Sequence, residues 1–181
     1  MLAVIRTVFF ISFGVLLMLC GKSQSRFAFD FETASTLPKF NAFGTKYELH
    51  ENPKESDVNA SLLVGRIHKE VGKAYRWSGV SVKAPWYVNL KHGGELKMKV
   101  FATTKRGKVQ VKFSDENNQI RAYSSAYISG LNQWEELTFR FKRNVDIRFS
   151  DLVLTFDEGS VEPHIYFFDD ITWIAGRPEV N

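Results

Sequence analysis

The chain has 181 residues, of which 44% are hydrophobic and 24% charged, a balance that excludes a disordered chain and suffices for one domain with its own core. Its formal net charge is +4, and Cys20 is its single cysteine. This charge is too small to indicate a nucleic-acid-binding protein, and one thiol excludes both an internal disulfide and a thiolate zinc site.

The N-terminal segment, residues 1–25, is typical of a secretory signal peptide. Arg6 precedes an apolar run from Val8 to Leu19, and Ser23 and Ser25 supply the small residues of a cleavage site. The apolar run is shorter than the roughly 20 residues that a membrane-spanning helix needs. We therefore expect export, with no transmembrane span in the mature form.

Residues 26–181 are expected to be one secreted or periplasmic domain. A second processing route is open, because Leu17–Cys20 resembles a bacterial lipoprotein box. Such boxes carry a small residue before the cysteine, whereas this chain has Leu19 there. A cell-surface lipoprotein anchored through Cys20 is therefore the alternative to a free protein.

Alternation of apolar and polar residues recurs along the mature chain, which is typical of half-buried β-strands, and no convincing helical period is found. The segment Thr103–Lys108 contains Gly107 and predicts a hairpin between the strands on either side of it. The predicted strands, in chain order, are Phe27–Phe31, Ser61–His68, Val80–Val82, Leu96–Val100, Val109–Phe113, Arg121–Tyr127, Glu136–Phe141, Asp151–Phe156 and Ile165–Ile174. Many short strands without a long helix predict an all-β fold, an antiparallel β-sandwich of the jelly-roll kind.

Three short motifs carry a family resemblance. They are Phe29–Glu32 at the start of the domain, Gly72–Gly79 in its middle and Tyr166–Ile171 near its end. In this order they resemble the jelly-roll carbohydrate-binding modules of the galactose-binding-domain-like type, which are often attached to bacterial glucanases. The resemblance covers about Phe27 to Ile174, and it implies binding of polysaccharide without catalysis.

The same resemblance implies a structural calcium ion, held between an acidic residue of the first strand and an aspartate of the last. The matching positions are Asp30 or Glu32 and Asp169 or Asp170. Calcium takes oxygen ligands, and a cation would relieve the repulsion between carboxylates that the fold brings together. The alternative is that these acids are solvated residues at strand ends.

A basic outer face is predicted from the alternation, because polar residues opposite the core would point to solvent. The residues expected to point inward are Leu96, Met98, Val100, Val109, Val111, Phe113, Leu137, Phe139 and Phe141. Those expected to point outward are Lys97, Lys99, Gln110, Lys112, Thr138, Arg140 and Lys142, with Arg121 and Tyr123 joining the same face. Such a face suits the uronate or sulfate groups of an acidic polysaccharide. The alternative is a solvated face whose lysines discourage association between sheet edges.

Aromatic side chains are the second candidate set, because rings stack on the apolar faces of sugars. Trp86 and Tyr87 follow Pro85 in an expected loop, which suits a binding platform, and Trp77 lies in the central motif. Trp134 and Trp173 are expected in the core. The predicted carbohydrate-binding residues are Trp77, Trp86, Tyr87, Lys97, Lys99, Lys112, Arg121, Tyr123 and Arg140.

Catalytic patterns are weak in this sequence, so the expected activity is non-catalytic binding by a monomer. Retaining hydrolases of sandwich fold carry two glutamates two or four residues apart on one strand, whereas Glu135 and Glu136 are adjacent and point to opposite faces. The motifs of jelly-roll lyases are missing too, with His164–Tyr166 the nearest match. A polysaccharide lyase or glycoside hydrolase remains one alternative, and a protein-interaction module of a cell-surface complex remains another.

Overall fold

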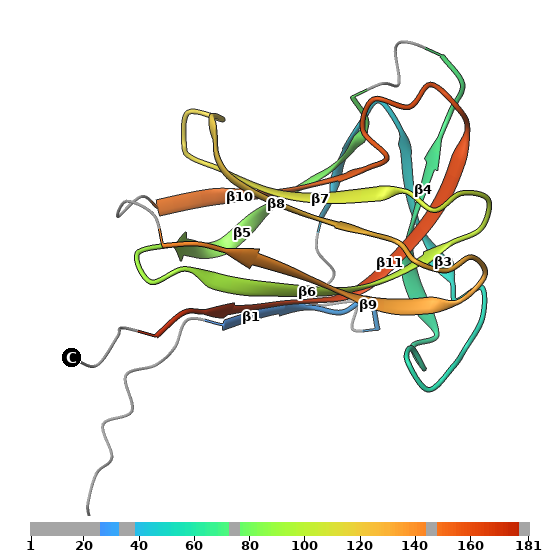
Figure 1. Ribbon diagram of the computed structural model, residues 1–181, viewed down its shortest axis with the longest axis horizontal. Coiled ribbons are helices and arrows are strands. Elements are labelled where there is room, and N and C mark those ends of the chain that lie inside the picture. The colour runs from blue at the N-terminus through green and yellow to red at the C-terminus, as the bar shows by residue number, and fades with distance from the viewer. Residues whose placement is uncertain (1–25, 33–38, 73–76, 144–147, 178–181) are drawn as a thin grey trace, which may run out of the picture.

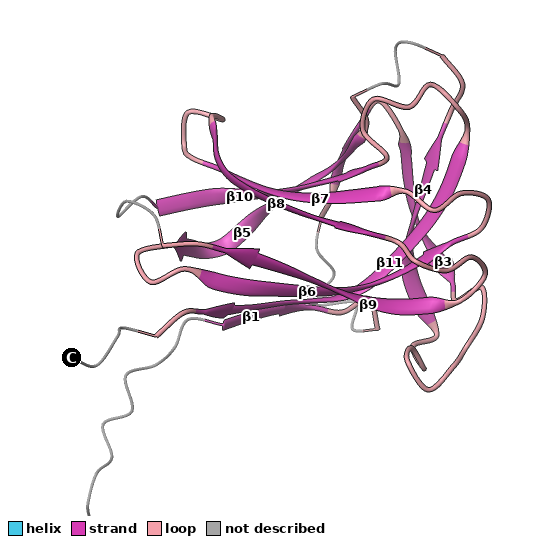
Figure 2. Ribbon diagram, viewed as in Figure 1, coloured by secondary structure: helices cyan, strands magenta, loops and turns pink. Residues whose placement is uncertain are grey.

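A computed structural model describes residues 26–32, 39–72, 77–143 and 148–177, without the side chains of residues 26, 27, 84–87 and 148. The described residues form eleven strands, and no helix is found among them (Figure 2). Within these ranges no helix has the length and apolarity to cross a membrane. The expected signal peptide and Cys20 lie outside the described residues.

Two antiparallel sheets stack face to face (Figure 1). Sheet A has the order β3-β4-β11-β6-β9, with β1 beside β11, and sheet B has the order β2-β5-β10-β7-β8. The strands of sheet A are β1 (Arg26–Phe29), β3 (Lys46–Glu51), β4 (Leu63–Lys69), β6 (Gly94–Ala102), β9 (Trp134–Phe141) and β11 (His164–Ala175). Those of sheet B are β2 (Asn41–Phe43), β5 (Gly79–Asn89), β7 (Lys108–Ser114), β8 (Ile120–Tyr127) and β10 (Arg148–Phe156). The predicted all-β jelly-roll sandwich is confirmed.

The core lies between the sheets and is built by alternation. Every residue expected to point inward from β6, β7 and β9 is buried, as is Trp173. Trp134 is also buried, but in a separate cluster outside this core. Trp173 packs edge to face on Phe113 of the opposite sheet, with ring centroids 5.3 Å apart. A Cβ atom at Gly94 would lie 2.1 Å from the Trp173 ring, so this position on β6 requires glycine.

A matched pair of truncations tests the inward register of β6. Val100 is fully buried, whereas Val71 lies in the connection after β4 with 68% of its surface exposed. We expect Val100→Ala to lower the free energy of unfolding by roughly 1.5 kcal/mol, because two buried methyl groups are removed, and Val71→Ala to change it by less than about 0.5 kcal/mol. Urea denaturation of both variants measures the difference, and equal effects would contradict the register.

The predicted hairpin between Leu96–Val100 and Val109–Phe113 is wrong. β6 belongs to sheet A and β7 to sheet B, so the segment between them passes from one sheet to the other. Alternation shows which side chains point inward, but it does not show which sheet a strand joins. The lysines of β6 and β7 therefore lie on opposite outer surfaces of the sandwich.

Three further differences concern strands. β2 escaped prediction because it has only three residues, all exposed, and β3 because its alternation is limited to Tyr47 and Leu49. β5 continues to Asn89, so Trp86 and Tyr87 lie within the range of a strand and not in a separate loop. Pairing with β10 is interrupted beside them, between the Lys83–Asp151 and Val88–Phe149 pairs. The side chains of Trp86 and Tyr87 are outside the described part of the structure.

Candidate functional site

The outer face of sheet A is partly covered by the chain itself. Residues 52–62 lie over one end of it, and beneath them Phe101, Trp134 and Phe167 form a small apolar cluster with Val64. The Trp134 indole Nε1 donates a hydrogen bond to Asn52 Oδ1 at 3.0 Å, which fixes this segment to the sheet. This part of sheet A is closed to a ligand.

Ion pairs neutralise the cations on the rest of that face. The pairs are Lys97 with Glu136 at 2.9 Å, Lys99 with Asp170 at 2.5 Å and Arg140 with Glu95 at 3.3 Å. The expectation of a single basic face is therefore wrong, since these cations lie on sheet A and Lys112, Arg121 and Tyr123 lie on sheet B.

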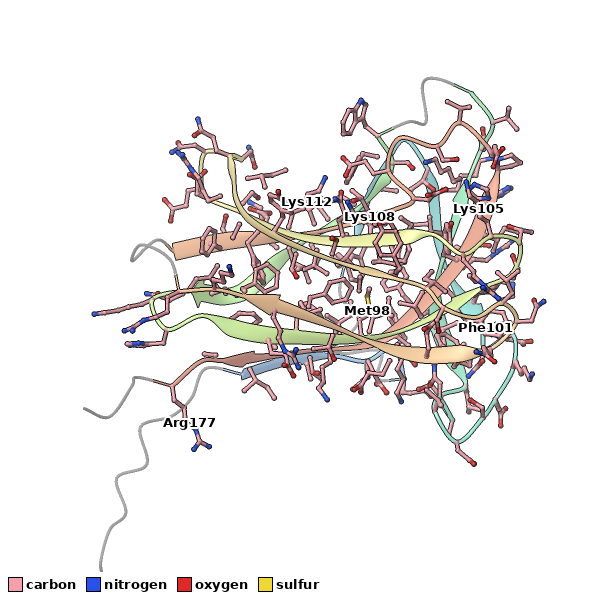
Figure 3. All side chains as sticks on the ribbon, in the orientation of Figure 1. Met98, Phe101, Lys105, Lys108, Lys112 and Arg177 are labelled. Carbon is pink, nitrogen blue, oxygen red and sulfur yellow. The ribbon has the colours of Figure 1, made fainter. Side chains whose placement is uncertain are left out.

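The outer face of sheet B is bordered by exposed aromatic rings. Tyr123 and Tyr127 on edge strand β8 are 69% and 71% exposed. They stand four residues apart on one face, about 13 Å at the usual rise of a strand. Each is paired with a lysine of β7, Tyr123 with Lys112 and Tyr127 with Lys108. Figure 3 shows Lys108 and Lys112 on the side of sheet B away from Met98, which lies between the sheets.

The centre of this face is polar. Lys112 Nζ donates hydrogen bonds to both carboxylate oxygens of Glu158, at 2.8 and 2.7 Å, and both side chains are largely buried. The Gln110 amide, oriented to donate to Glu158, accepts a hydrogen bond from Lys108 Nζ at 3.2 Å. Thr155 on β10 completes the group with a 3.4 Å hydrogen bond to Glu158. These side chains offer donors and acceptors of the kind that sugar hydroxyls need.

A buried lysine fixes the loop that carries Glu158 onto the face. Lys69 on β4 has no exposed surface, and its Nζ donates to the Asp157 carbonyl at 2.8 Å, while the Asp157 amide donates to the Lys108 carbonyl at 2.8 Å. Burial lowers the pKa of Lys69, and the nearby Asp157 carboxylate opposes that shift. In Figure 1 this loop, between β10 and β11, rises above one end of sheet B, and the turn between β7 and β8 rises above the other.

Trp77 lies near the opposite edge of sheet B from the two tyrosines, with 65% of its surface exposed. It precedes β5 by two residues, and its carbonyl would lie 2.6 Å from a Cβ atom at Gly44, whose φ of +57° turns the chain between β2 and β3. Phe43 of β2 is also exposed. The polar strip thus has exposed rings on both sides.

Asp115 closes the turn between β7 and β8 and positions Arg121. Its carboxylate accepts from the amides of Asn117 and Gln119 at 2.9 and 3.0 Å and from Arg121 Nε at 3.0 Å. The hydrogen bond from Gln119, followed by Arg121, lowers the pKa of Asp115. This turn holds the guanidinium next to Tyr123.

The lowered pKa of Asp115 predicts a pH effect on stability. A carboxyl group whose pKa is lower in the folded state stabilises the fold above its unfolded pKa, about 3.9, and loses that contribution as pH falls through the folded value. We expect Asp115→Asn to flatten the decrease in the free energy of unfolding below about pH 4. Urea denaturation between pH 5 and pH 2 measures this, and a profile parallel to the wild type would contradict it.

The candidate calcium ligands separate into two groups. The strand β11 pairs with β4 up to Phe168 and with β1 from Ile171 onward. Asp169 and Asp170 are the two residues between these pairings. Asp169 is fully buried, and its Oδ2 has no hydrogen-bond partner within the described ranges. Burial raises the pKa of Asp169, and the nearby Ser61, the Asp170 amide and Asn59 oppose the rise. A buried, unpartnered carboxylate oxygen fits one ligand of a calcium ion.

The other three predicted ligands are engaged elsewhere. Asp170 adopts a φ of +46° and pairs with Lys99 on the outer face. Glu32 Oε1 accepts from the Leu63 amide at 2.8 Å, and Asp30 Oδ1 accepts from the Glu32 amide at 3.2 Å. Among the described residues no three acidic, histidine or cysteine side chains gather as a metal cluster. Of the four predicted ligands, Asp169 is thus the one whose buried carboxylate oxygen lacks a hydrogen-bond partner among the described residues.

The structure brings together part of the predicted binding set. Lys112, Arg121 and Tyr123 share the sheet B side, Trp77 borders it, and Lys97 and Lys99 lie on the other side of the sandwich. Arg140 lies on sheet A but reaches the edge where β9 approaches β8. Glu158 was missed, because its partner Lys112 is 46 residues away and no local pattern links them.

No family model and no curated protein matches this chain. Solved structures do. An exo-β-agarase matches with a TM-score of 0.62 and 9% identity, over 83% of this chain and 25% of that one. The CBM22-1 and GH10 modules of Clostridium thermocellum endo-1,4-β-D-xylanase 10B, complexed with xylohexaose, match with a TM-score of 0.59 and 14% identity, over 86% and 29%.

A match over almost the whole of the other chain is a variant of CBM29-2, a family 29 carbohydrate-binding module, complexed with mannohexaose. Its TM-score is 0.54 at 13% identity, and the match covers 84% of this chain and 93% of that one. The chain has the fold of carbohydrate-binding modules. By contrast, it spans about a quarter of the agarase and xylanase chains, so their activities do not transfer with the fold.

Proposed function

We propose that this protein binds polysaccharide without cleaving it, through the outer face of sheet B. The observation that carries this proposal is the pair of exposed tyrosines, Tyr123 and Tyr127, in line on β8 beside the hydrogen-bonding strip of Lys108, Gln110 and Lys112. Rings of this kind stack on the apolar faces of sugars, and the strip can bind the hydroxyls. On the outer face of sheet A, where residues 52–62 and ion pairs cover the surface, the described residues form no comparable row of exposed rings.

The solved structures support a binder over an enzyme. The module matched over 93% of its length is a carbohydrate-binding module in complex with a hexasaccharide, whereas the agarase and xylanase matches are partial. Glu135, one of the adjacent glutamates of β9, accepts hydrogen bonds from the Ser129 amide and hydroxyl at 2.8 and 2.7 Å. Glu136 pairs with Lys97. Both glutamates therefore have structural partners.

Affinity electrophoresis in gels containing xylan, glucomannan, agarose or pectate tests the proposal, with product analysis in parallel. Retarded migration without new chain ends is the expected result. New reducing ends would identify a hydrolase and unsaturated ends a lyase, and either would contradict non-catalytic binding. Unchanged migration in every gel would favour a protein-interaction module.

We also propose a structural calcium ion at the junction of β1, β4 and β11, with Asp169 as its principal ligand. The support is the buried, unpartnered Oδ2 of Asp169, together with the polar side chains of Asn59 and Ser61 nearby. Such an ion would fix the end of β1 to the last strand and would leave the sugar-binding face untouched.

A further inference from the structure

A hollow of about 330 Å³ opens between edge strand β8 of sheet B and edge strand β9 of sheet A. β8 contributes Arg121, Ala122 and Tyr123, and β9 contributes Arg140 and Phe141. Leu90, Lys142 and Arg143 complete the lining. The hollow is thus formed where the two sheets meet along one open side of the sandwich.

The lining of the hollow is cationic. Arg121, Arg140, Lys142 and Arg143 contribute four positive charges, and none of the described residues that line the hollow is acidic. Asp115 and Glu95 pair with Arg121 and Arg140 from outside the lining. Lys142 has no ion-pair partner among the described residues, so within this part of the chain the positive charges around the hollow exceed the negative charges.

Apolar groups strengthen the interaction that these charges would make. Leu90 is fully buried and Phe141 is nearly so, and both line the hollow. An ion pair beside low-dielectric side chains is screened less than one in open water. Guanidinium groups also bind carboxylate and sulfate through two parallel hydrogen bonds, which gives preference to planar or tetrahedral oxyanions.

Tyr123 connects this hollow to the proposed sugar-binding face. Its ring is one of the two that stand on the outer face of sheet B, and the same side chain lines the hollow. A glycan that lies along β8 from Tyr127 to Tyr123 reaches Arg121 and the other cations next. The hollow is therefore positioned as the end of the same binding surface.

We propose that this hollow is a subsite for an anionic substituent of the bound glycan, a uronate carboxylate or a sulfate ester, so that the natural ligand is an acidic polysaccharide. This inference rests on the proposed function and adds the substrate class. The cations that carry it are those of the β8–β9 edge, and not the lysines of β6, whose carboxylate partners neutralise them on the other side of the sandwich.

Two matched pairs of glycans test the subsite in affinity gels. Pectate against its fully methyl-esterified form isolates the carboxylate, and carrageenan against its desulfated form isolates the sulfate ester. We expect the charged member of at least one pair to bind roughly tenfold tighter at low salt, with the difference shrinking as sodium chloride is raised, because exposed ion pairs are screened. The pair that shows the difference identifies the anion.

The double variant Arg140→Gln/Lys142→Gln removes two of the cations at exposed positions. In the pair of glycans that shows a preference for the charged member, this variant is expected to lose most of that preference. It should still bind the neutral member. The control Lys46→Gln/Lys54→Gln changes the net charge equally on other parts of the surface and should behave as the wild type. Circular dichroism checks that each variant is folded.

The outcomes separate the two proposals. Equal binding of charged and neutral glycans, or a difference that survives in Arg140→Gln/Lys142→Gln, would overturn the anionic subsite and leave polysaccharide binding intact. A loss in the Lys46→Gln/Lys54→Gln control as large as in the test variant would also overturn it, since net charge would then explain the effect. Absence of binding to all four glycans and to neutral xylan and glucomannan would overturn both proposals.

Discussion

Replacing Tyr123 and Tyr127 together by alanine is expected to weaken polysaccharide binding about a hundredfold and to leave the melting temperature almost unchanged. A stacked ring that buries its apolar area against a sugar contributes about 1–2 kcal/mol, and every 1.4 kcal/mol is a factor of ten in affinity. Both rings are more than two-thirds exposed, so their removal leaves no cavity in the core. Each single variant should lose about tenfold.

Three variants make the tyrosine experiment specific. Tyr123→Phe and Tyr127→Phe keep the rings and should retain most of the binding. Leu62→Ala removes an exposed apolar side chain from the segment that covers sheet A, and it should bind as the wild type does. Isothermal titration against the glycan that retards the protein most measures all of them. Wild-type affinity in the double alanine variant would contradict binding at this face.

The core of this fold was predictable because side-chain direction in a strand is a local property. Leu96, Met98 and Val100 alternate with lysines, and that pattern alone determines that the three point inward. Sheet membership depends on pairing with distant strands, and β6 pairs with β9 and β11 while β7 pairs with β8 and β10. The sequence pattern therefore predicted which residues of each strand point inward and which point outward. It did not predict which strands belong to the same sheet.

The net charge of each outer face was less predictable than the direction in which its side chains point. Lys97 points outward as expected, but its partner Glu136 lies 39 residues later on a neighbouring strand. Lys112 meets Glu158 only because Lys69, Asp157 and the Lys108 carbonyl fix the loop after β10. Such partners come from tertiary pairing, so a row of lysines in the sequence overstated the basic character of the folded face.

The hollow between β8 and β9 shows the same dependence on tertiary structure. Arg121, Tyr123 and Arg140 were each predictable as outward residues, yet they belong to different sheets. They approach one another because both β8 and β9 are edge strands on the same side of the sandwich. Arg143 is the second residue after the end of β9, where no strand pattern marks it. A cationic site of this kind follows from the architecture and not from one segment.

Chelation of calcium is the second change for which we expect a large effect. When the free calcium concentration is about one hundred times the dissociation constant, binding stabilises the folded state by about 2.7 kcal/mol. For a chain of this length that shifts the melting temperature by roughly 5–10 °C. Differential scanning calorimetry of the purified protein with EGTA, and after calcium is restored, should show this shift and its reversal. Magnesium added in place of calcium should restore less, because magnesium requires stricter octahedral geometry.

Asparagine substitutions at two neighbouring aspartates decide whether the ion is bound as proposed. With calcium present, Asp169→Asn should lower the melting temperature to the EGTA value and abolish the response to EGTA, since a charged ligand is lost. Asp170→Asn should keep the response, because that carboxylate pairs with Lys99 and asparagine tolerates its φ of +46°. Without an ion, a charged Asp169 is costly in its buried position, and the neutral amide would be as stable as the wild type or more so. An Asp169→Asn protein with an unchanged or raised melting temperature, together with a wild type indifferent to EGTA, would therefore contradict the calcium site and leave the sandwich and its tyrosine face as they are.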